Sequence, residues 1–171
     1  FGLWHEDSDH NLQRNFYFLN ADTPPNRGYF YRSPDVRVFE QDFDSRTQVW
    51  YLNDRIALMD GRFTIDAGFK ALDAEIEAVS RRGTRAQGRI EAKDSFLPQL
   101  GLRFEVAPGL ELFGSYAENM AAFRAGVNGP FSASQSGFDA IRSTLRPETS
   151  TTFEGGLRYG NDGFQSSLTL Y

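Results

Sequence analysis

The residues best suited to chemistry in this chain lie close to its start. His5 and His10 are near Glu6, Asp7 and Asp9, and imidazole and carboxylate groups are the side chains that bind divalent metals. Nothing in their spacing fixes a ligand geometry, so a solvated, acidic strand end explains them better. The sequence therefore predicts no metal site here.

Patterns that indicate catalysis are absent from the sequence. The chain has no Cys, which excludes disulfides and thiolate metal sites, and no glycine motif that would cradle a phosphate. No serine lies in the sequence context of a nucleophile elbow. The net charge of −5 gives no indication of a nucleic-acid partner. We therefore expect neither an enzyme nor a cofactor.

Aromatic residues and arginines gather in three long segments, 9–44, 73–97 and 119–148, which we expect to be loops. Guanidinium groups bind carboxylates through two parallel hydrogen bonds and also stack on rings, so this combination suits an anionic or aromatic chelate. The same groups would also stack on sugars or pack the loops against each other. The candidate ligand-contacting residues are Tyr17, Tyr29, Tyr31, Arg81, Arg82, Arg85, Phe123 and Arg124.

The elements that must position these loops are strands. Six stretches alternate apolar and polar residues with a period of two, and the first residues of the chain predict a further strand before them. In residues 61–72, for example, the apolar side chains occupy the odd positions and the polar ones the even positions. The sequence therefore predicts an all-β, antiparallel sheet of about seven strands.

Three short joins, 59–61, 107–109 and 160–163, connect these strands in pairs and keep the apolar faces together. A two-residue Asp60-Gly61 loop is a favoured hairpin turn. The predicted cross-strand pairs are Leu58 with Phe63, Ile56 with Ile65, Leu52 with Phe69, Val106 with Leu110, Phe104 with Leu112, Leu100 with Tyr116, Tyr159 with Phe164, and Phe153 with Leu170.

The order of the joins is the main clue to the fold class. Short and long joins alternate along the chain, which places every tight turn at one end of the sheet and every long loop at the other. An up-and-down transmembrane β-barrel has this asymmetry, because its two rims face different compartments. No run approaches the roughly 18 apolar residues of a membrane helix.

In such a barrel one strand face contacts lipid. The expected lipid-facing residues are Phe63, Ile65, Phe69, Leu100, Leu102, Phe104, Leu112, Tyr116, Tyr159, Phe164 and Leu168. Among them, Phe63, Phe104, Tyr159 and Phe164 lie near short turns, as in the aromatic girdle of an outer-membrane barrel. The residues expected on the inner face, in polar networks, are Arg62, Asp66, Lys70, Arg103, Glu105, Glu154 and Arg158.

Asp54 departs from the pattern, since it shares a face with Trp50, Leu52 and Ile56. Either it sits near the membrane interface or a bulge rotates it inward, and the sequence leaves both open.

Several segments together resemble a known family. Residues 96–102 (FLPQLGL) with 108–116 (PGLELFGSY), residues 145–150 (LRPETS) with 153–158 (FEGGLR), and the hairpin 50–68 are similar to segments of TonB-dependent outer-membrane receptors. Phe69-Lys70 departs from the family's usual arginine there.

The resemblance implies a barrel of about 22 strands around a plug, in the outer membrane of a Gram-negative bacterium. It implies active import of a scarce ligand, by default a ferric siderophore, driven by the TonB–ExbB–ExbD complex. Residues 1–171 would then be a partial barrel domain without the plug, because both termini look like cuts made within strands. The contact with TonB would belong to the missing part.

Other functions remain open at this point. A passive outer-membrane channel would use the same strands without a plug, and a related receptor would import a carbohydrate or cobalamin. In a soluble β-sandwich or a lipocalin-like binder, the apolar faces would instead cover a protein core.

Overall fold

The computed structural model describes residues 1–18 and 31–171 and is dominated by β-strands. Within this part of the chain the strands are β1 (Gly2–Phe16), β2 (Val36–Leu58), β3 (Phe63–Arg82), β4 (Gly88–Ala107), β5 (Leu110–Ala121), β6 (Glu148–Asn161) and β7 (Phe164–Leu170). Two short helices, η2 (Pro130–Ser132) and α1 (Gln135–Ile141), lie between β5 and β6.

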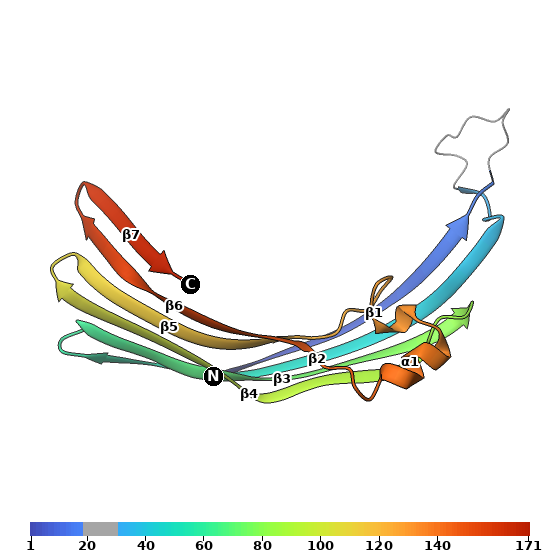
Figure 1. Cartoon of the computed structure of the whole chain (residues 1–171), viewed down its shortest axis with the longest axis horizontal. Coiled ribbons are helices and arrows are strands. Elements are labelled where there is room, and N and C mark those ends of the chain that lie inside the picture. The colour runs from blue at the N-terminus through green and yellow to red at the C-terminus, as the bar shows by residue number, and fades with distance from the viewer. Residues whose placement is uncertain (19–30) are drawn as a thin grey trace.

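These strands form one antiparallel sheet in which each strand pairs with its neighbours in sequence, from β1 to β7. The sheet is a long curved band that does not close on itself (Figure 1). The predicted all-β, up-and-down architecture is confirmed for this part of the chain. The described residues contain no helix of the length and hydropathy needed to cross a bilayer.

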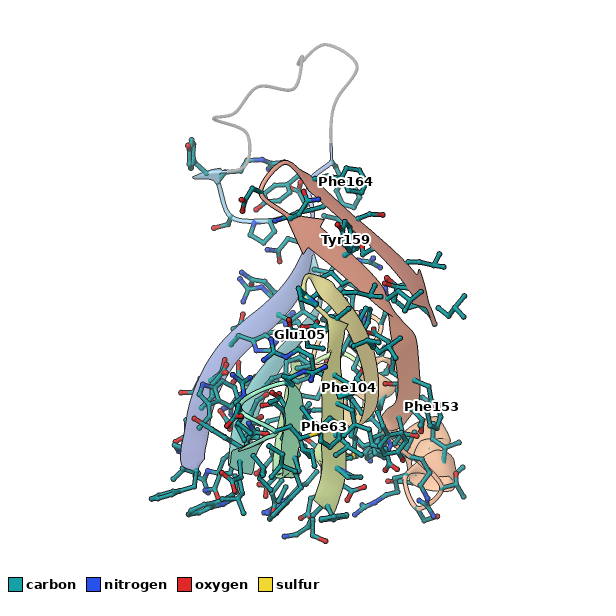
Figure 2. All side chains as sticks on the ribbon, turned by 90° about the vertical axis from the view of Figure 1, so that its left-hand side faces the viewer. Phe63, Phe104, Glu105, Phe153, Tyr159 and Phe164 are labelled. Atoms are coloured by element: carbon teal, nitrogen blue, oxygen red, sulfur yellow. The ribbon has the colours of Figure 1, made fainter. Side chains whose placement is uncertain are left out.

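The two ends of the sheet differ as predicted, except that the β3–β4 connection at the second end is also short. The β2–β3, β4–β5 and β6–β7 turns gather at one end, and the end of β1, the start of β2 and helix α1 lie at the other (Figure 1). We call these the turn end and the loop end. Figure 2 looks onto the turn end and labels Phe63 beside Phe104, and Tyr159 beside Phe164. The ring centroids of these pairs are 6.1 and 6.4 Å apart.

The prediction of a long loop over residues 73–97 was wrong. Strand β3 continues to Arg82 and β4 begins at Gly88, so only residues 83–87 connect them. Residues 73–78 keep the strand alternation, but they place acidic side chains on one face and Ala74, Ile76 and Ala78 on the other. The first predicted loop was also too long, because β1 reaches Phe16 and β2 starts at Val36.

Most of the predicted pairs in the first two hairpins are confirmed. Leu58 pairs with Phe63, Ile56 with Ile65, Leu52 with Phe69, Phe104 with Leu112, and Leu100 with Tyr116. The first loop, however, spans residues 59–62, with positive φ at Met59 and Asp60. Val106 does not pair with Leu110, because a register shift after Glu105 brings Ala107 there.

The register predicted for the β6–β7 hairpin was wrong by two residues. Asn161 pairs with Phe164 and Leu157 with Leu168, so Tyr159 does not pair with Phe164 and Phe153 does not pair with Leu170. The side chain of Asn161 accepts hydrogen bonds from the backbone N–H groups of Gly163 and Phe164 and so tightens this turn. A slip of two residues leaves every side chain on its predicted face.

Each face of the sheet changes character along the strands. Near the turn end, β3 presents Phe63, Ile65 and Phe69 on one face, which we call the apolar band. Toward the loop end the same face carries Asp73, Glu75 and Glu77. The apolar side chains there lie on the opposite face, where Ile76 and Ala78 are buried.

That opposite face carries the largest buried cluster of the described residues, at the loop end. Phe43, Ile76, Ala78, Ala86 and Ile90 pack beneath Phe131 and Phe138 from the β5–β6 connection. Both of these phenylalanines are 0% exposed. The connection therefore folds back over the sheet, and we call it the loop cap (residues 122–147).

Asp54 lies on the apolar band. It pairs with Ala67 in an unbroken stretch of the β2–β3 ladder, so no bulge turns it to the other face. Its carboxylate accepts a hydrogen bond from the backbone N–H of Arg55, at 2.9 Å.

Candidate ligand-binding surface

The loop cap is joined to the β3–β4 turn by hydrogen bonds that involve the backbone. The N–H of Ala86 donates to the carbonyl of Ala133 at 2.9 Å. Gln135 uses both ends of its amide, accepting from the N–H of Gln87 at 2.9 Å and donating to the Gln87 carbonyl at 3.2 Å. The two connections therefore form one unit at the loop end.

A buried glutamine connects this unit to the sheet. Gln41 in β2 is 0% exposed, and its amide nitrogen donates to the carbonyl of Ala86 at 2.6 Å and to that of Phe131 at 3.4 Å. One side chain thus bonds the strand to the turn and to the cap. Since polar groups are costly to bury without partners, these bonds favour a single arrangement of the three segments.

Helix α1 is short and capped within the loop cap. The hydroxyl oxygen of Ser134 accepts a hydrogen bond from the N–H of Gly137 at 3.2 Å, which satisfies one of the free donors of the first turn. The helix places Phe138 on the core and leaves Ile141 exposed. Its role is to hold an aromatic side chain against the sheet.

The predicted ligand-contacting residues do not form one site. Arg81 and Arg82 are the last residues of β3 rather than loop residues. Arg81 forms an ion pair with Asp42 at 2.6 Å on the acidic part of the face that carries the apolar band, which we call the charged face. Arg85 lies in the β3–β4 turn over the ring of Phe39. Arg85 and Arg81 are therefore held by different partners.

The other candidates are spread over the loop end. Phe123 is partly buried against the core, and Arg124 is exposed in the loop cap. The guanidinium of Arg32 lies 5.8 Å from the ring centroid of Tyr17, and Tyr31 is 88% exposed. Tyr29 lies outside the described residues.

A hollow of about 400 Å³ opens beside the loop cap. Phe123 and Leu145 line it from the cap, Ile90 from β4, and Arg89, Glu91, Arg142 and Ser143 surround it. The hollow combines apolar walls with a charged rim, which suits a small amphipathic molecule.

Sequence reasoning missed several residues that shape this surface, among them Arg14, Phe39 and Gln41. Arg14 lies directly across from Phe39 in the β1–β2 ladder. Their contact depends on how β1 pairs with β2, and the sequence alone did not reveal this pairing because the two residues are far apart in the chain. Alternation alone assigns them to faces but not to each other.

The two histidines are separated by the strand. The Nε2 atom of His5 donates to the carboxylate of Asp7 at 3.1 Å, whereas the ring of His10 stacks on that of Phe43 with the ring centroids 4.9 Å apart. Positions five apart in a strand point to opposite faces, so the two rings cannot share a ligand. Among the described residues there is no group of three or more side chains able to hold a metal ion.

Part of the predicted inner-face network is present. Glu111 in β5 binds Arg103 at 3.5 Å and Arg158 at 3.2 Å, and Arg55 binds Asp66 at 2.6 Å. A hollow of about 260 Å³ lies beside the first group, near the turn end. Glu105, labelled next to Phe104 in Figure 2, lines this hollow.

A protein-family model described as TonB dependent receptor-like, beta-barrel matches residues 1–171. The chain belongs to this family. TonB-dependent receptors are outer-membrane transport receptors and form a transporter family rather than an enzyme family. Neither the curated proteins nor the solved structures compared with the chain gave a match.

Membership of the TonB-dependent receptor family accounts for the form of the sheet. Antiparallel strands in sequence order, three short turns at one end and the larger β1–β2 and β5–β6 connections at the other are features of the barrel wall.

Proposed function

We propose that this chain is part of the wall of an outer-membrane receptor that imports a scarce ligand, a ferric siderophore, with energy from the TonB–ExbB–ExbD complex. The observation that carries the proposal is the family match over residues 1–171, on a sheet with an exposed apolar band. The barrel of about 22 strands and its plug belong to this proposal.

The extent of the apolar band supports insertion into a bilayer. On β3 the band runs over residues 63–71, which is close to the roughly 9–11 residues that a tilted strand needs to cross. Leu100, Leu102, Leu112 and Leu157 are exposed on the same band, although each is a large apolar side chain. Contact of this apolar surface with water is unfavourable, whereas its contact with lipid is not.

The predicted lipid-facing set is spread over this band, and we propose that all of it contacts lipid. Phe63 and Phe104, with Tyr159 and Phe164, form the girdle at the turn end, which we assign to the periplasmic rim. Trp50, Phe69, Phe96, Tyr116 and Phe153 form a second aromatic group at the other edge of the band.

The strands extend beyond this second group toward the outside. There the same face carries ion pairs between neighbouring strands, such as Lys93 with Asp73 at 2.5 Å and Arg89 with Glu75. Charged pairs of this kind are stable in contact with water and polar head groups. The loop end therefore projects from the membrane and meets the ligand first.

The test is uptake by the organism that makes the full-length receptor. Deletion of the gene should abolish growth on one ferric siderophore of a panel under iron limitation and the uptake of that siderophore labelled with ⁵⁵Fe. Uptake should also cease in a strain that lacks TonB. Uptake that persists without TonB would favour a passive channel, and growth defects on a sugar or cobalamin instead would change the ligand class.

A further inference from the structure

Two guanidinium groups share one aromatic ring at the loop end. The Cζ atom of Arg85 lies 3.8 Å from the ring centroid of Phe39, and that of Arg14 lies 5.9 Å from it. Phe39 is only 5% exposed, so its ring is a fixed platform. Cation–π attraction holds each arginine there in spite of their mutual repulsion.

Neither arginine has a carboxylate partner among the described residues. Arginines nearby do: Arg37 binds Glu40 at 2.7 Å, and Arg81 binds Asp42 at 2.6 Å. The Nη1 atom of Arg85 is buried and makes no hydrogen bond. A buried donor of a charged group without an acceptor is costly, and Arg85 as a whole is only partly buried, so an anion can reach its guanidinium.

The backbone on either side of Arg85 is held in place. The N–H of Ala86 bonds to the carbonyl of Ala133, and the Ala86 carbonyl accepts from the side chain of Gln41. Arg85 itself forms a β-bridge with Ser134 of the loop cap. Because the guanidinium is positioned before any ligand arrives, little entropy is lost on binding.

The electrostatic environment agrees with this geometry. Burial and the neighbouring charge of Arg14 lower the pKa of Arg85 below its ordinary value. An anion placed between the two guanidinium groups would relieve this repulsion. The planar fork of each guanidinium matches the two oxygens of a carboxylate or phosphate.

We propose that Arg14 and Arg85 bind an oxyanion group, carboxylate or phosphate, of a ligand that enters from the loop end. The ring of Phe39 orients both guanidinium groups, and the loop cap fixes Arg85 above it. This inference rests on the proposed function for the side of entry and goes beyond it by naming the chemistry that the receptor recognises.

The experiment uses the full-length receptor, purified in detergent, with sodium citrate and inorganic phosphate as the probes and sodium chloride at matched ionic strength as the reference. Calorimetric titration gives the affinity, and thermal unfolding gives the shift in Tm that follows binding. We expect citrate or phosphate to raise the Tm of the unsubstituted receptor, and the stronger of the two identifies the preferred oxyanion.

The variants distinguish anion binding at this site from a general effect of positive charge on the protein. Arg85→Gln and Arg14→Gln should each weaken binding about tenfold or more, as expected for loss of a charge-assisted hydrogen bond. Arg85→Lys keeps the charge but loses the fork and should weaken binding several-fold. Arg46→Gln is the control, because Arg46 is an exposed arginine paired with Asp7 at 3.1 Å, and it should bind as the unsubstituted receptor does.

Two results would overturn the proposal: no binding of either probe, or equal affinity of the unsubstituted receptor and both glutamine variants. Loss of folding is checked by the Tm without a probe, which should change little in Arg14→Gln because loss of the cation–π contact with Phe39 and relief of the repulsion from Arg85 oppose each other. Uptake is a separate measurement. Siderophore import without oxyanion binding would refute this site alone, and oxyanion binding without TonB-dependent import would refute the proposed function alone.

Discussion

Phe69 and Asp73 lie on the same face of β3, with only Ala71 between them on that face, and the face changes character from one to the other. The ring centroids of Phe69 and Phe96 are 5.3 Å apart, whereas the carboxylate of Asp73 forms an ion pair with the amine of Lys93 at 2.5 Å. A single sheet face therefore meets two environments, which we assign to lipid and to the polar region outside it.

A charge placed within the apolar band should impair assembly. Leu102 pairs with Ile65 and Gly114 on this band. We expect Leu102→Arg to lower the free energy of unfolding of the full-length receptor in lipid by about 2–4 kcal/mol, because a lipid-facing arginine near mid-depth costs that much. Urea titration in liposomes measures it.

The matched control changes the neighbouring residue on the other face. Arg103→Leu removes a partly exposed ion pair with Glu111, which keeps Arg158 as a partner, and a 3.3 Å hydrogen bond to the hydroxyl of Thr64, and should cost only about 1 kcal/mol. If Leu102→Arg and Arg103→Leu had equal effects, the assignment of the apolar band to lipid would be wrong.

Asp54 should be a destabilising residue. Its side chain lies on the apolar band between Leu52 and Ile56, and the described residues offer it no cationic partner. Asp54→Leu should raise the free energy of unfolding in lipid by about 1–2 kcal/mol, somewhat less than the cost of a lysine or arginine at the same depth. Asp66→Leu, which breaks the ion pair with Arg55, should not raise the free energy of unfolding. A stability loss in Asp54→Leu would show that another group binds this carboxylate.

Two carboxylates on the charged face should respond to pH in opposite directions. The amide of Asn11 and then the guanidinium of Arg81 hold the pKa of Asp42 below its usual value. Desolvation and then a hydrogen bond with Asp9 raise the pKa of Asp44. Asp42 therefore adds stability above its unfolded-state pKa and loses it as the pH falls through its lower folded-state pKa. Asp44 favours the folded state at low pH, and this contribution is lost as the pH rises through its raised folded-state pKa.

Substitution by asparagine tests these signs. Asp42→Asn should lower stability at pH 7 and reduce its loss on acidification, whereas Asp44→Asn should raise stability at pH 7 and match the unsubstituted protein in acid. Urea titrations from pH 3 to pH 7 supply the comparison. If the stabilities of the two variants change in the same direction at pH 7, the opposite pKa shifts assigned to Asp42 and Asp44 are wrong.

The loop cap should open when its buried aromatic is removed. Phe138 is fully buried and lies 4.9 Å from Phe131, measured between ring centroids. Phe138→Ala should reduce the local opening free energy of the cap by about 3–5 kcal/mol. Hydrogen exchange at the amide of Ala86, which bonds to the cap, reports this opening.

Ile141 in the same helix provides the control. It is 43% exposed, so Ile141→Ala should change exchange at Ala86 little. Unchanged protection of Ala86 in Phe138→Ala would mean that the cap is not held by this contact.

Alternation along the chain was enough to predict the strands, their order and the faces of most residues. It failed over residues 73–97, because acidic residues on an exposed strand face look like loop residues when water rather than lipid is the neighbour. It also left the β6–β7 register two residues out, since a slip of two keeps Leu157, Leu168 and Leu170 on their predicted face.

The sequence by itself determined the two-sided sheet, because side chains in a strand alternate whatever surrounds them. Only the tertiary structure decided that Arg85, far along the chain from Arg14, lies over the same ring, and that Phe131 and Phe138 cover Phe43. These contacts depend on how the strands pair and on how the loop cap folds back. No local pattern encodes that return, because it is fixed by packing and hydrogen bonding between distant segments.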